Sequence, residues 1–411
     1  MTIAEFFQEY WTYLTIPLVS AIVGYGTNWL AVKMMMGPVE FQGVGPIGWQ
    51  GVIPANSEKM ARVVVDHSVR RVLTQEELIS RVHPEHLVDA MSNRLENFVE
   101  ELVDEVMEQT TSYGFKVSNF LWSASPIWLK EKVYDEVKKQ LPDMVRKMVD
   151  DIKDESEDLL DLNELIVEKL GNNKEMLIDI FKTSGAKEFR FLERSGFYFG
   201  FPLGIPVMFL WYFYPVWWLL PLFGLLVGYL TNTIAIYLIQ KPVEPVKVGP
   251  FTILGLFIKR QKEVSRYFGK VFAEDLIRAE IVAEEFLKSK NSVDRIRDMI
   301  HREVNHSLEA TQGSFKPLTV MSIGPTQYAR ISDIISDRTI KELERPDKRS
   351  LNYIDKAFDI EETVAERVGN LPGEEFYELL HPVVAEDEWK LIAVGAVLGL
   401  LAGFWQWALL T

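Results

Sequence analysis

The chain of 411 residues contains no cysteine. This absence excludes disulfide bonds, thiolate metal sites and cysteine nucleophiles, although it does not identify a cellular compartment. Three signatures of catalytic sites are missing as well: a phosphate-binding Walker loop, a Gly-x-Ser-x-Gly nucleophile elbow and a His-Glu-x-x-His zinc motif. We therefore expect neither an enzyme nor a protein with a resident cofactor.

Histidine is scarce, with six residues in the whole chain. His83 and His86 lie three positions apart, but Pro84 separates them and no third ligand follows at helical spacing. His301 and His306 are five positions apart, which does not place them on one helical face. We expect no metal site.

Basic residues are fewer than acidic ones. The chain has 44 lysines and arginines and 59 aspartates and glutamates, which gives a net charge of −15. The acidic residues gather in polar segments such as 96–108 and 150–158. We interpret these segments as solvated helical faces that charge keeps soluble. An acidic surface opposes nucleic-acid binding, which needs a basic footprint, so we predict no nucleic-acid partner.

Apolar residues gather in three runs, Tyr13–Met36, Phe197–Ile239 and Leu391–Leu410. A membrane-spanning helix needs ~20 apolar residues, so the outer runs each span once and the middle run spans twice, with a turn near Tyr214 and Pro215. The predicted division is an outer tail and first span at 1–36, a polar helical segment at 37–196, spans at 197–214 and 215–240, a second polar helical segment at 241–388, and a fourth span at 389–411. The spans contain no aspartate or glutamate, which argues against an ion-coupled pump.

The membrane-spanning sequence occurs twice. Gly24–Asn28 (GYGTN) returns as Gly228–Asn232 (GYLTN) at an offset of 204 residues (228 − 24), and the match continues to Gly51 and Gly255. Glycines at four-residue steps also match in the second and fourth spans, at an offset of 199 (395 − 196). A self-match at a fixed offset indicates two copies of one structural unit. We predict two parallel repeats, each made of a span, a polar excursion and a returning span.

Basic residues flank both polar segments, whereas the opposite side of the predicted membrane has essentially none. The flanking residues are Lys33, Lys59, Arg62, Lys187, Arg190, Arg194, Lys241, Lys247, Lys259, Arg260, Lys262 and Lys390. Lysine and arginine near span ends mark the cytoplasmic side. Both polar segments are therefore expected in the cytoplasm, with the two termini and the turn near Tyr214 outside.

The polar segments carry apolar stripes at steps of three and four residues, which is typical of amphipathic helices. The stripes are Leu87, Met91, Leu95, Phe98, Leu102 and Val106; Val133, Val137, Leu141, Met144, Met148 and Ile152; and Val293, Ile296, Ile300, Val304 and Leu308. We expect a break at Pro84 and a kink or break at Pro142. The fold class is thus an all-α membrane protein, with four transmembrane helices and two long cytoplasmic excursions that pack together into a stalk-like bundle. The stretches rich in proline and glycine at 38–54 and 242–255 predict a short hairpin or loop at the membrane surface.

Asn28 and Asn232 are the main polar candidates inside the spans, together with the neighbouring Thr27 and Thr231. Either they line a polar conduit, or they join helices where the two repeats meet, with the two amides close to each other. Glycines at four-residue steps give each helix a bare strip that another backbone can approach, within the chain or in a homodimer. The predicted helix-packing residues are Gly24, Gly228, Gly196, Gly200, Gly204, Gly395, Gly399 and Gly403.

Four stretches together resemble one bacterial family. They are Gly-Tyr-x-Thr-Asn-x-x-Ala with the loop that follows it, Lys187-Glu188-Phe189 before a glycine-stepped span, Phe376–Pro382, and Glu386–Trp389. In these places the chain is similar to the membrane-protein family catalogued as domain of unknown function 445. The resemblance implies an integral protein of the bacterial inner membrane and brings no catalytic residues. The two copies of the repeat differ at Lys33, whose counterpart in the second copy is Tyr237.

Two functions remain open. In the first, the protein is a membrane scaffold whose cytoplasmic bundle binds a protein partner or its own copies. In the second, the spans form a conduit or groove for lipid or another hydrophobic solute. Membrane lipid is a partner in both, and self-association is expected in the first.

Overall fold

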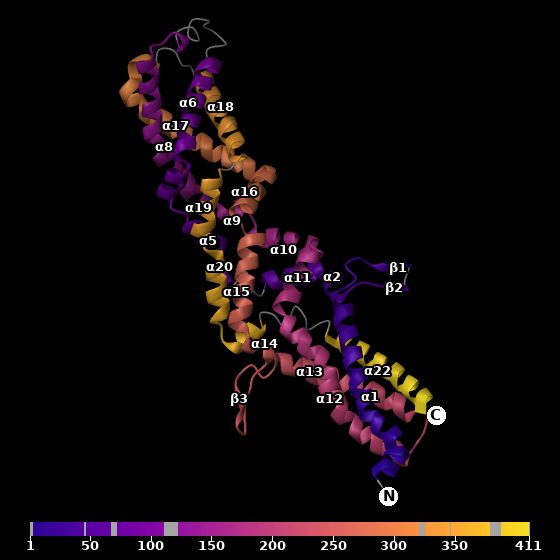
Figure 1. Ribbon diagram of the computed structural model, residues 1–411. Coiled ribbons are helices and arrows are strands. Elements are labelled where there is room, and N and C mark those ends of the chain that lie inside the picture. The colour runs from indigo at the N-terminus through magenta and orange to yellow at the C-terminus, as the bar shows by residue number, and fades with distance from the viewer. Residues whose placement is uncertain are drawn as a thin grey trace. The chain divides into compact units, whose positions relative to one another are not determined.

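The computed structural model describes residues 3–44, 47–66, 72–110, 122–319, 325–345, 347–378 and 388–410 (Figure 1). The chain forms two compact units. Unit 1 comprises Met1–Val72, Ile166–Val271 and Glu361–Thr411, and unit 2 comprises Leu73–Leu165 and Phe272–Ile360. Each predicted polar excursion is therefore divided between the two units, a division that the apolar runs alone did not indicate.

Unit 1 contains four helices that are long and apolar enough to cross a membrane: α1 (Ile3–Met36), α12 (Ala186–Phe213), α13 (Leu219–Gln240) and α22 (Glu388–Leu410). The prediction of an all-α membrane protein with four such helices is confirmed. Residues 214–218 connect α12 to α13, as the sequence predicts. α12 begins earlier than the expected position 197, because its polar first turns continue the apolar helix without a break.

The four helices pack in two pairs, α1 with α12 and α13 with α22, and α12 also packs against α13. One apolar cluster joins the start of α1, the end of α12 and the start of α13 through Ile16, Trp211 and Leu220, with Trp407 of α22 against it. The N-terminal end of α1 and the C-terminal end of α22 thus lie at the same end of this group as the α12–α13 connection (Figure 1).

A short antiparallel hairpin follows each of α1 and α13. β1 (Gln42–Val44) pairs with β2 (Ile47–Trp49), and β3 (Val246–Val248) pairs with β4 (Phe251–Ile253). The predicted hairpin or loop is thus a hairpin in each excursion, and its place at the membrane surface stays a prediction. Trp49 ties the first hairpin back to α1, because its indole Nε1 donates to the Met34 carbonyl at 3.1 Å.

Short helices complete unit 1. They are α2 (Val52–Ala55), α3 (Ser57–Val64), α11 (Lys174–Ser184), α14 (Leu256–Lys259), α15 (Gln261–Val271), most of α10 (Leu162–Asn172) and most of α20 (Ile360–Gly369). Side chains bridge the outgoing and returning parts of each excursion. Ser57 Oγ donates to the Gly171 carbonyl at 3.1 Å, and Gln261 Nε2 donates to the Val368 carbonyl at 2.8 Å. In each excursion, short helices next to the spans are therefore held together by these side-chain hydrogen bonds.

Unit 2 is a helical bundle with its own apolar core. Its helices are α5 (Gln75–Ser80), α6 (Pro84–Thr110), α8 (Ile127–Asp154), α9 (Ser156–Leu159), the π-helix η2 (Phe272–Leu276), α16 (Ala279–Lys288), α17 (Lys290–Thr319), α18 (Pro325–Leu343) and α19 (Lys348–Phe358). Leu159 from the first excursion packs with Met299 and Ile340 from the second. Met144, Met148 and Ile152 of the second predicted stripe pack against the cluster that contains Ile296, Ile300 and Val304 of the third, and the stalk-like bundle as a whole stays a prediction.

The two prolines behave differently. Pro84 is the first residue of α6, where the missing N–H costs nothing, so the predicted break is confirmed. α8 continues through Pro142, so a break there is wrong. Pro142 is exposed, and water can bond the carbonyl of Lys138 that the proline leaves without an N–H partner.

Candidate functional site

The predicted packing glycines lie where the helices of each pair touch. A Cβ added at Gly24 would collide with the Gly196 carbonyl, and one added at Gly228 would collide with the Gly395 carbonyl. The same holds for Gly200 against Ser20, Gly204 against Pro17, Gly399 against Gly224, and Gly403 against Leu220 and Pro221. The close approach is within the chain, between a span and the span that returns. Sequence reasoning missed Gly224, although it lies four residues before Gly228 and extends the same bare strip.

The two asparagines are buried and bind the returning helices. Asn28 Nδ2 donates to the Leu192 carbonyl at 2.8 Å and to Ser195 Oγ at 3.3 Å. Asn232 Nδ2 donates to the Leu391 carbonyl at 2.9 Å. The glycine contacts make these bonds possible, because they bring the backbones of α12 and α22 within reach of a short side chain.

The amides of Asn28 and Asn232 do not bond to each other, since the Oδ1 atom of each lacks a hydrogen-bond partner within the described part of the chain. Each amide donates to the returning helix of its own pair, and the expected proximity of Asn28 and Asn232 where the repeats meet stays a prediction. The adjacent threonines bond within their own helices: Thr27 Oγ1 donates to the Gly24 carbonyl at 3.0 Å, and Thr231 Oγ1 to the Gly228 carbonyl at 3.2 Å. These bonds satisfy both hydroxyls without a partner from another helix.

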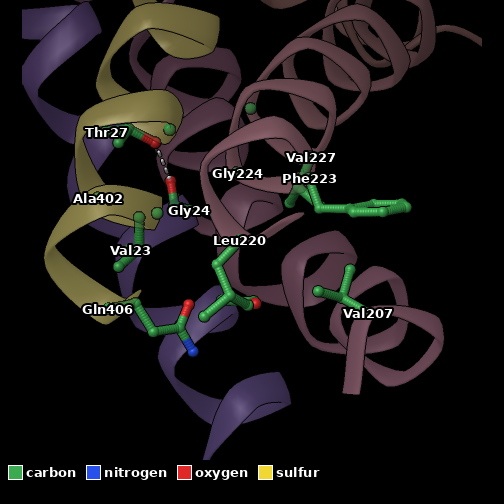
Figure 2. A pocket seen from close by; sticks show the side chains of 14 residues that line it. Val23, Gly24, Thr27, Val207, Leu220, Phe223, Gly224, Val227, Ala402 and Gln406 are labelled. Carbon is green, nitrogen blue, oxygen red and sulfur yellow. Dashed lines mark hydrogen bonds between the residues drawn. The ribbon is translucent and has the colours of Figure 1, made fainter. Parts of the chain in front are cut away.

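A small cavity of about 30 Å³ lies among the four spanning helices. Figure 2 shows side chains around it, among them Val23 and Thr27 of α1, Val207 of α12, Leu220 of α13 and Gln406 of α22. Gln406 is buried, and its Nε2 atom has no hydrogen-bond partner among the residues that the structure describes. A water needs roughly 10–15 Å³ of such space, so the cavity has room for a water or two beside this amide. It has no room for a lipid or a comparable solute.

A cluster of charges lies at the base of α12. Glu188, in the first turn of the helix, is buried and pairs with Arg260, whose Nη2 atom also lies 3.0 Å from Glu263 Oε1. Lys187 Nζ lies 2.8 Å from Glu263 Oε2. Hydrogen bonds from Arg260 and then Lys187 lower the pKa of Glu263 from 4.5 to about 2, and the hydrogen bond to Glu263 raises the pKa of Arg260. The cluster fixes the start of α12 to the start of α15.

Sequence reasoning used Lys187 and Arg260 only as markers of orientation and missed this cluster. Glu188 was the available signal, because a carboxylate in the first turn of a spanning helix needs a partner when it is buried. Among the described residues, no group of three or more histidine, aspartate or glutamate side chains could hold a metal ion.

The chain is similar to three bacterial membrane proteins over short stretches. It is 40% identical over 75 residues to a UPF0754 membrane protein of Thermosynechococcus vestitus, covering 17% of this chain and 18% of the relative. Similar proteins of the same name come from Staphylococcus epidermidis, with 33% identity over 85 residues (20% and 22% coverage), and from Staphylococcus aureus strain JH9, with 33% identity over 99 residues (23% and 26% coverage). The chain thus spans 18% to 26% of the length of these curated relatives.

No family model matches the chain. No solved structure matches it either. The names of the relatives agree with the four apolar helices and describe a membrane protein without an activity. They support the resemblance to a bacterial membrane family of unknown function, but they do not carry the name domain of unknown function 445.

Proposed function

We propose that the protein is a membrane-anchored scaffold whose unit 2 binds a protein partner or further copies of the chain. The observation that carries this proposal is a contrast in packing. The membrane helices touch at glycine backbones around a cavity of about 30 Å³, which is too small for a solute path. Unit 2 has a separate core built from two excursions that are far apart in the sequence. A polar, folded unit thus lies outside the four spans. The simplest function for such a unit is to bind another protein.

Two exposed apolar side chains support a contact surface on unit 2. Ile127 is 74% exposed and Trp128 is 65% exposed, both in the first turn of α8. Among the described residues of unit 2, these are the large apolar side chains left in solvent. Tryptophan is enriched at the energetic centres of protein interfaces. Trp128 is therefore the residue with which to test the proposal.

The scaffold predicts association that depends on α8. Purified protein in mild detergent should run as an oligomer, or with a co-purified protein, in size-exclusion chromatography with light scattering. Trp128→Ala should weaken that association about tenfold or more, as the loss of a buried interface tryptophan typically does. Trp128→Phe, which keeps an aromatic ring, is the matched control and should retain most of the association. A wild-type protein that stays monomeric and without a partner at all concentrations contradicts the scaffold.

A second candidate is the binding of a hydrophobic ligand. Unit 2 contains an apolar cavity of about 180 Å³ between α5, α8, α16 and α19, lined among others by Leu78, Val149, Phe286 and Ile354. An apolar cavity of ~150 Å³ is large enough to bind benzene, so this one could hold a segment of an acyl chain. In the contrary outcome, the protein remains monomeric, retains phospholipid through purification and moves labelled lipid between liposomes. That result would favour binding of a hydrophobic ligand over the scaffold function. Neither candidate includes an enzymatic reaction.

We further infer that the chain consists of two parallel repeats. The support is the agreement of contacts at matching positions. Asn28 bonds the Leu192 carbonyl as Asn232 bonds the Leu391 carbonyl. Gly51 N donates to the Pro38 carbonyl and Gly255 N to the Pro242 carbonyl, both at 2.9 Å. The residues of the outgoing parts (Asn28, Pro38 and Gly51) match their counterparts at an offset of 204. Leu192 of the returning helix matches Leu391 at an offset of 199.

We also propose that unit 2 is cytoplasmic and that the chain lies in the bacterial inner membrane. The support is the basic residues near the span ends, together with the N-terminal end of α1 and the C-terminal end of α22, which lie beside the α12–α13 connection. The cysteine-free chain suits a labelling test with single cysteines at Thr2, Pro215 and Thr411. Labelling from outside the cell is expected at all three. Labelling of all three from the cytoplasmic side alone would reverse the topology.

A further inference from the structure

One face of α12 changes from basic to apolar along its length. Lys187, Arg190, Phe191, Arg194 and Tyr198 surround a hollow of about 280 Å³ on this helix. Their spacing of three and four residues places them on the same helical face. All but Phe191 are exposed. The result is a basic hollow with aromatic rings at the polar end of a spanning helix.

The same face continues into the membrane as an exposed apolar strip. Phe201, Ile205 and Phe209 follow Tyr198 at steps of three, four and four residues, and they are 44%, 37% and 55% exposed. No other described helix of the chain covers them, so they face the hydrocarbon of a bilayer. A charged group in the hollow would therefore sit directly above the acyl chains that pack on this strip.

Of the three basic residues of the hollow, Lys187 is paired with Glu263, whereas the two arginines have no ion pair within the described residues. Arg190 Nε donates to the Ala186 carbonyl of its own helix at 3.2 Å, and neither Arg190 nor Arg194 has an ion pair there. Lys187 pairs with Glu263, and Glu188 pairs with Arg260. Glu193 is three residues after Arg190 and is its neighbour on the helix, but it does not line the hollow and has no ion pair in the described part of the chain.

We propose that this face of α12 binds an anionic phospholipid. The phosphate lies between Arg190 and Arg194, and an acyl chain lies along Phe201, Ile205 and Phe209. Guanidinium groups bind phosphate oxygens with two parallel hydrogen bonds, and basic residues beside the inner leaflet attract anionic lipids. The inference rests on α12 crossing the membrane and does not depend on the scaffold function.

The second half of the membrane unit supplies an internal control. At the offset of 199 residues, Trp389 and Ala393 of α22 stand where α12 has Arg190 and Arg194, and Val397 stands where α12 has Tyr198. α22 keeps exposed apolar side chains, such as Leu401 and Phe404, but has no pair of arginines. The proposal therefore assigns one lipid to α12 and none to the matching face of α22.

Native mass spectrometry of the full-length protein tests the proposal, with phosphatidylglycerol and phosphatidylcholine of identical acyl chains. The wild type should retain phosphatidylglycerol preferentially. The double variant Arg190→Gln with Arg194→Gln should retain about tenfold less of it, close to the level of phosphatidylcholine. The control Lys259→Gln with Lys262→Gln removes two basic residues outside the hollow and should change nothing. Equal retention of both lipids by the wild type, or an unchanged preference in the arginine variant, overturns the proposal.

Two further measurements separate lipid from free phosphate and guard against misfolding. Inorganic phosphate at millimolar concentration should not displace the lipid, because it makes no contact with the apolar strip. Displacement by inorganic phosphate would assign the hollow to a soluble anion instead. A photoreactive phosphatidylglycerol should label wild-type α12 peptides and leave α22 peptides unlabelled, a result that needs no variant to fold. Equal labelling of both helices would contradict the assignment.

Discussion

The four spanning helices of unit 1 form two halves, α1 with α12 and α13 with α22. The two halves agree at the positions where backbones touch and differ at the positions where side chains point outward. Gly196 packs against Gly24 as Gly395 packs against Gly228, and the asparagine next to each contact bonds a carbonyl of the returning helix. On the outward faces, Arg190 and Arg194 of α12 correspond to Trp389 and Ala393 of α22, and Lys390 of α22 corresponds to Phe191 of α12. A close helix contact tolerates few residue types, whereas a lipid-facing position tolerates many apolar ones. The shared positions therefore hold the bundle together, and the positions that differ are the ones to search for function.

The largest effect is expected from the glycine contacts. Gly24→Leu would drive a side chain into the Gly196 backbone, which cannot move without separating α1 from α12. We expect a loss of ~3 kcal/mol or more in the free energy of unfolding, or failure to assemble. Thermal unfolding in detergent measures the loss.

Gly26→Leu is the matched control, because an added Cβ at Gly26 would meet no atom within 4 Å. It lies two residues away on the same helix, on an exposed face. Similar stability of the two variants would contradict the role of the Gly24 contact. The equivalent change Gly228→Leu should resemble Gly24→Leu if the two halves use one packing scheme.

A smaller effect is expected from the asparagines, and it should be unequal between the halves. Asn28→Leu removes bonds to the Leu192 carbonyl and to Ser195 Oγ, whereas Asn232→Leu removes one bond to the Leu391 carbonyl. Hydrogen bonds between membrane helices contribute ~1 kcal/mol or less each, so both variants should unfold at a modestly lower temperature. Asn28→Leu should lose more.

Val394 stands in α22 where α12 has Ser195, so Ser195→Val in the Asn28 half provides the comparison. It should bring the cost of Asn28→Leu close to that of Asn232→Leu. An equal cost of the two asparagine variants in the wild-type background would show that Ser195 contributes nothing measurable.

The sequence predicted the contacts that depend on the spacing of residues along one helix. The glycine steps indicated the close faces of α12 and α22, and the apolar stripes indicated that the two excursions share a core. It did not predict which helix each asparagine would bond, because that depends on the depth at which two helices cross. The sequence also did not predict the ion cluster of Glu188 and Arg260, since these residues are 72 positions apart and no spacing rule connects them.

The smallest effect concerns the ion cluster, which joins Lys187 and Glu188 of the first half to Arg260 and Glu263 of the second half. Lys59 stands where the repeat offset of 204 would place a match for Glu263. The folded state lowers the pKa of Glu263 from 4.5 to about 2. The stabilisation is therefore complete above pH 4.5 and is lost as the pH falls through this range towards 2. Glu263 is half exposed, so solvent screening keeps the gain small.

Glu263→Gln should lower the unfolding temperature slightly at pH 6 and make it less dependent on pH between 4.5 and 2 than in the wild type. Glu58→Gln is the control from the first half, because Glu58 belongs to an exposed pair with Arg62 and should leave the pH profile unchanged. The measurement is the unfolding temperature in detergent across this pH range. Parallel profiles for wild type and Glu263→Gln would mean that Glu263 adds no stability, and the buried pair of Glu188 and Arg260 would then be the remaining ionic contact of the cluster.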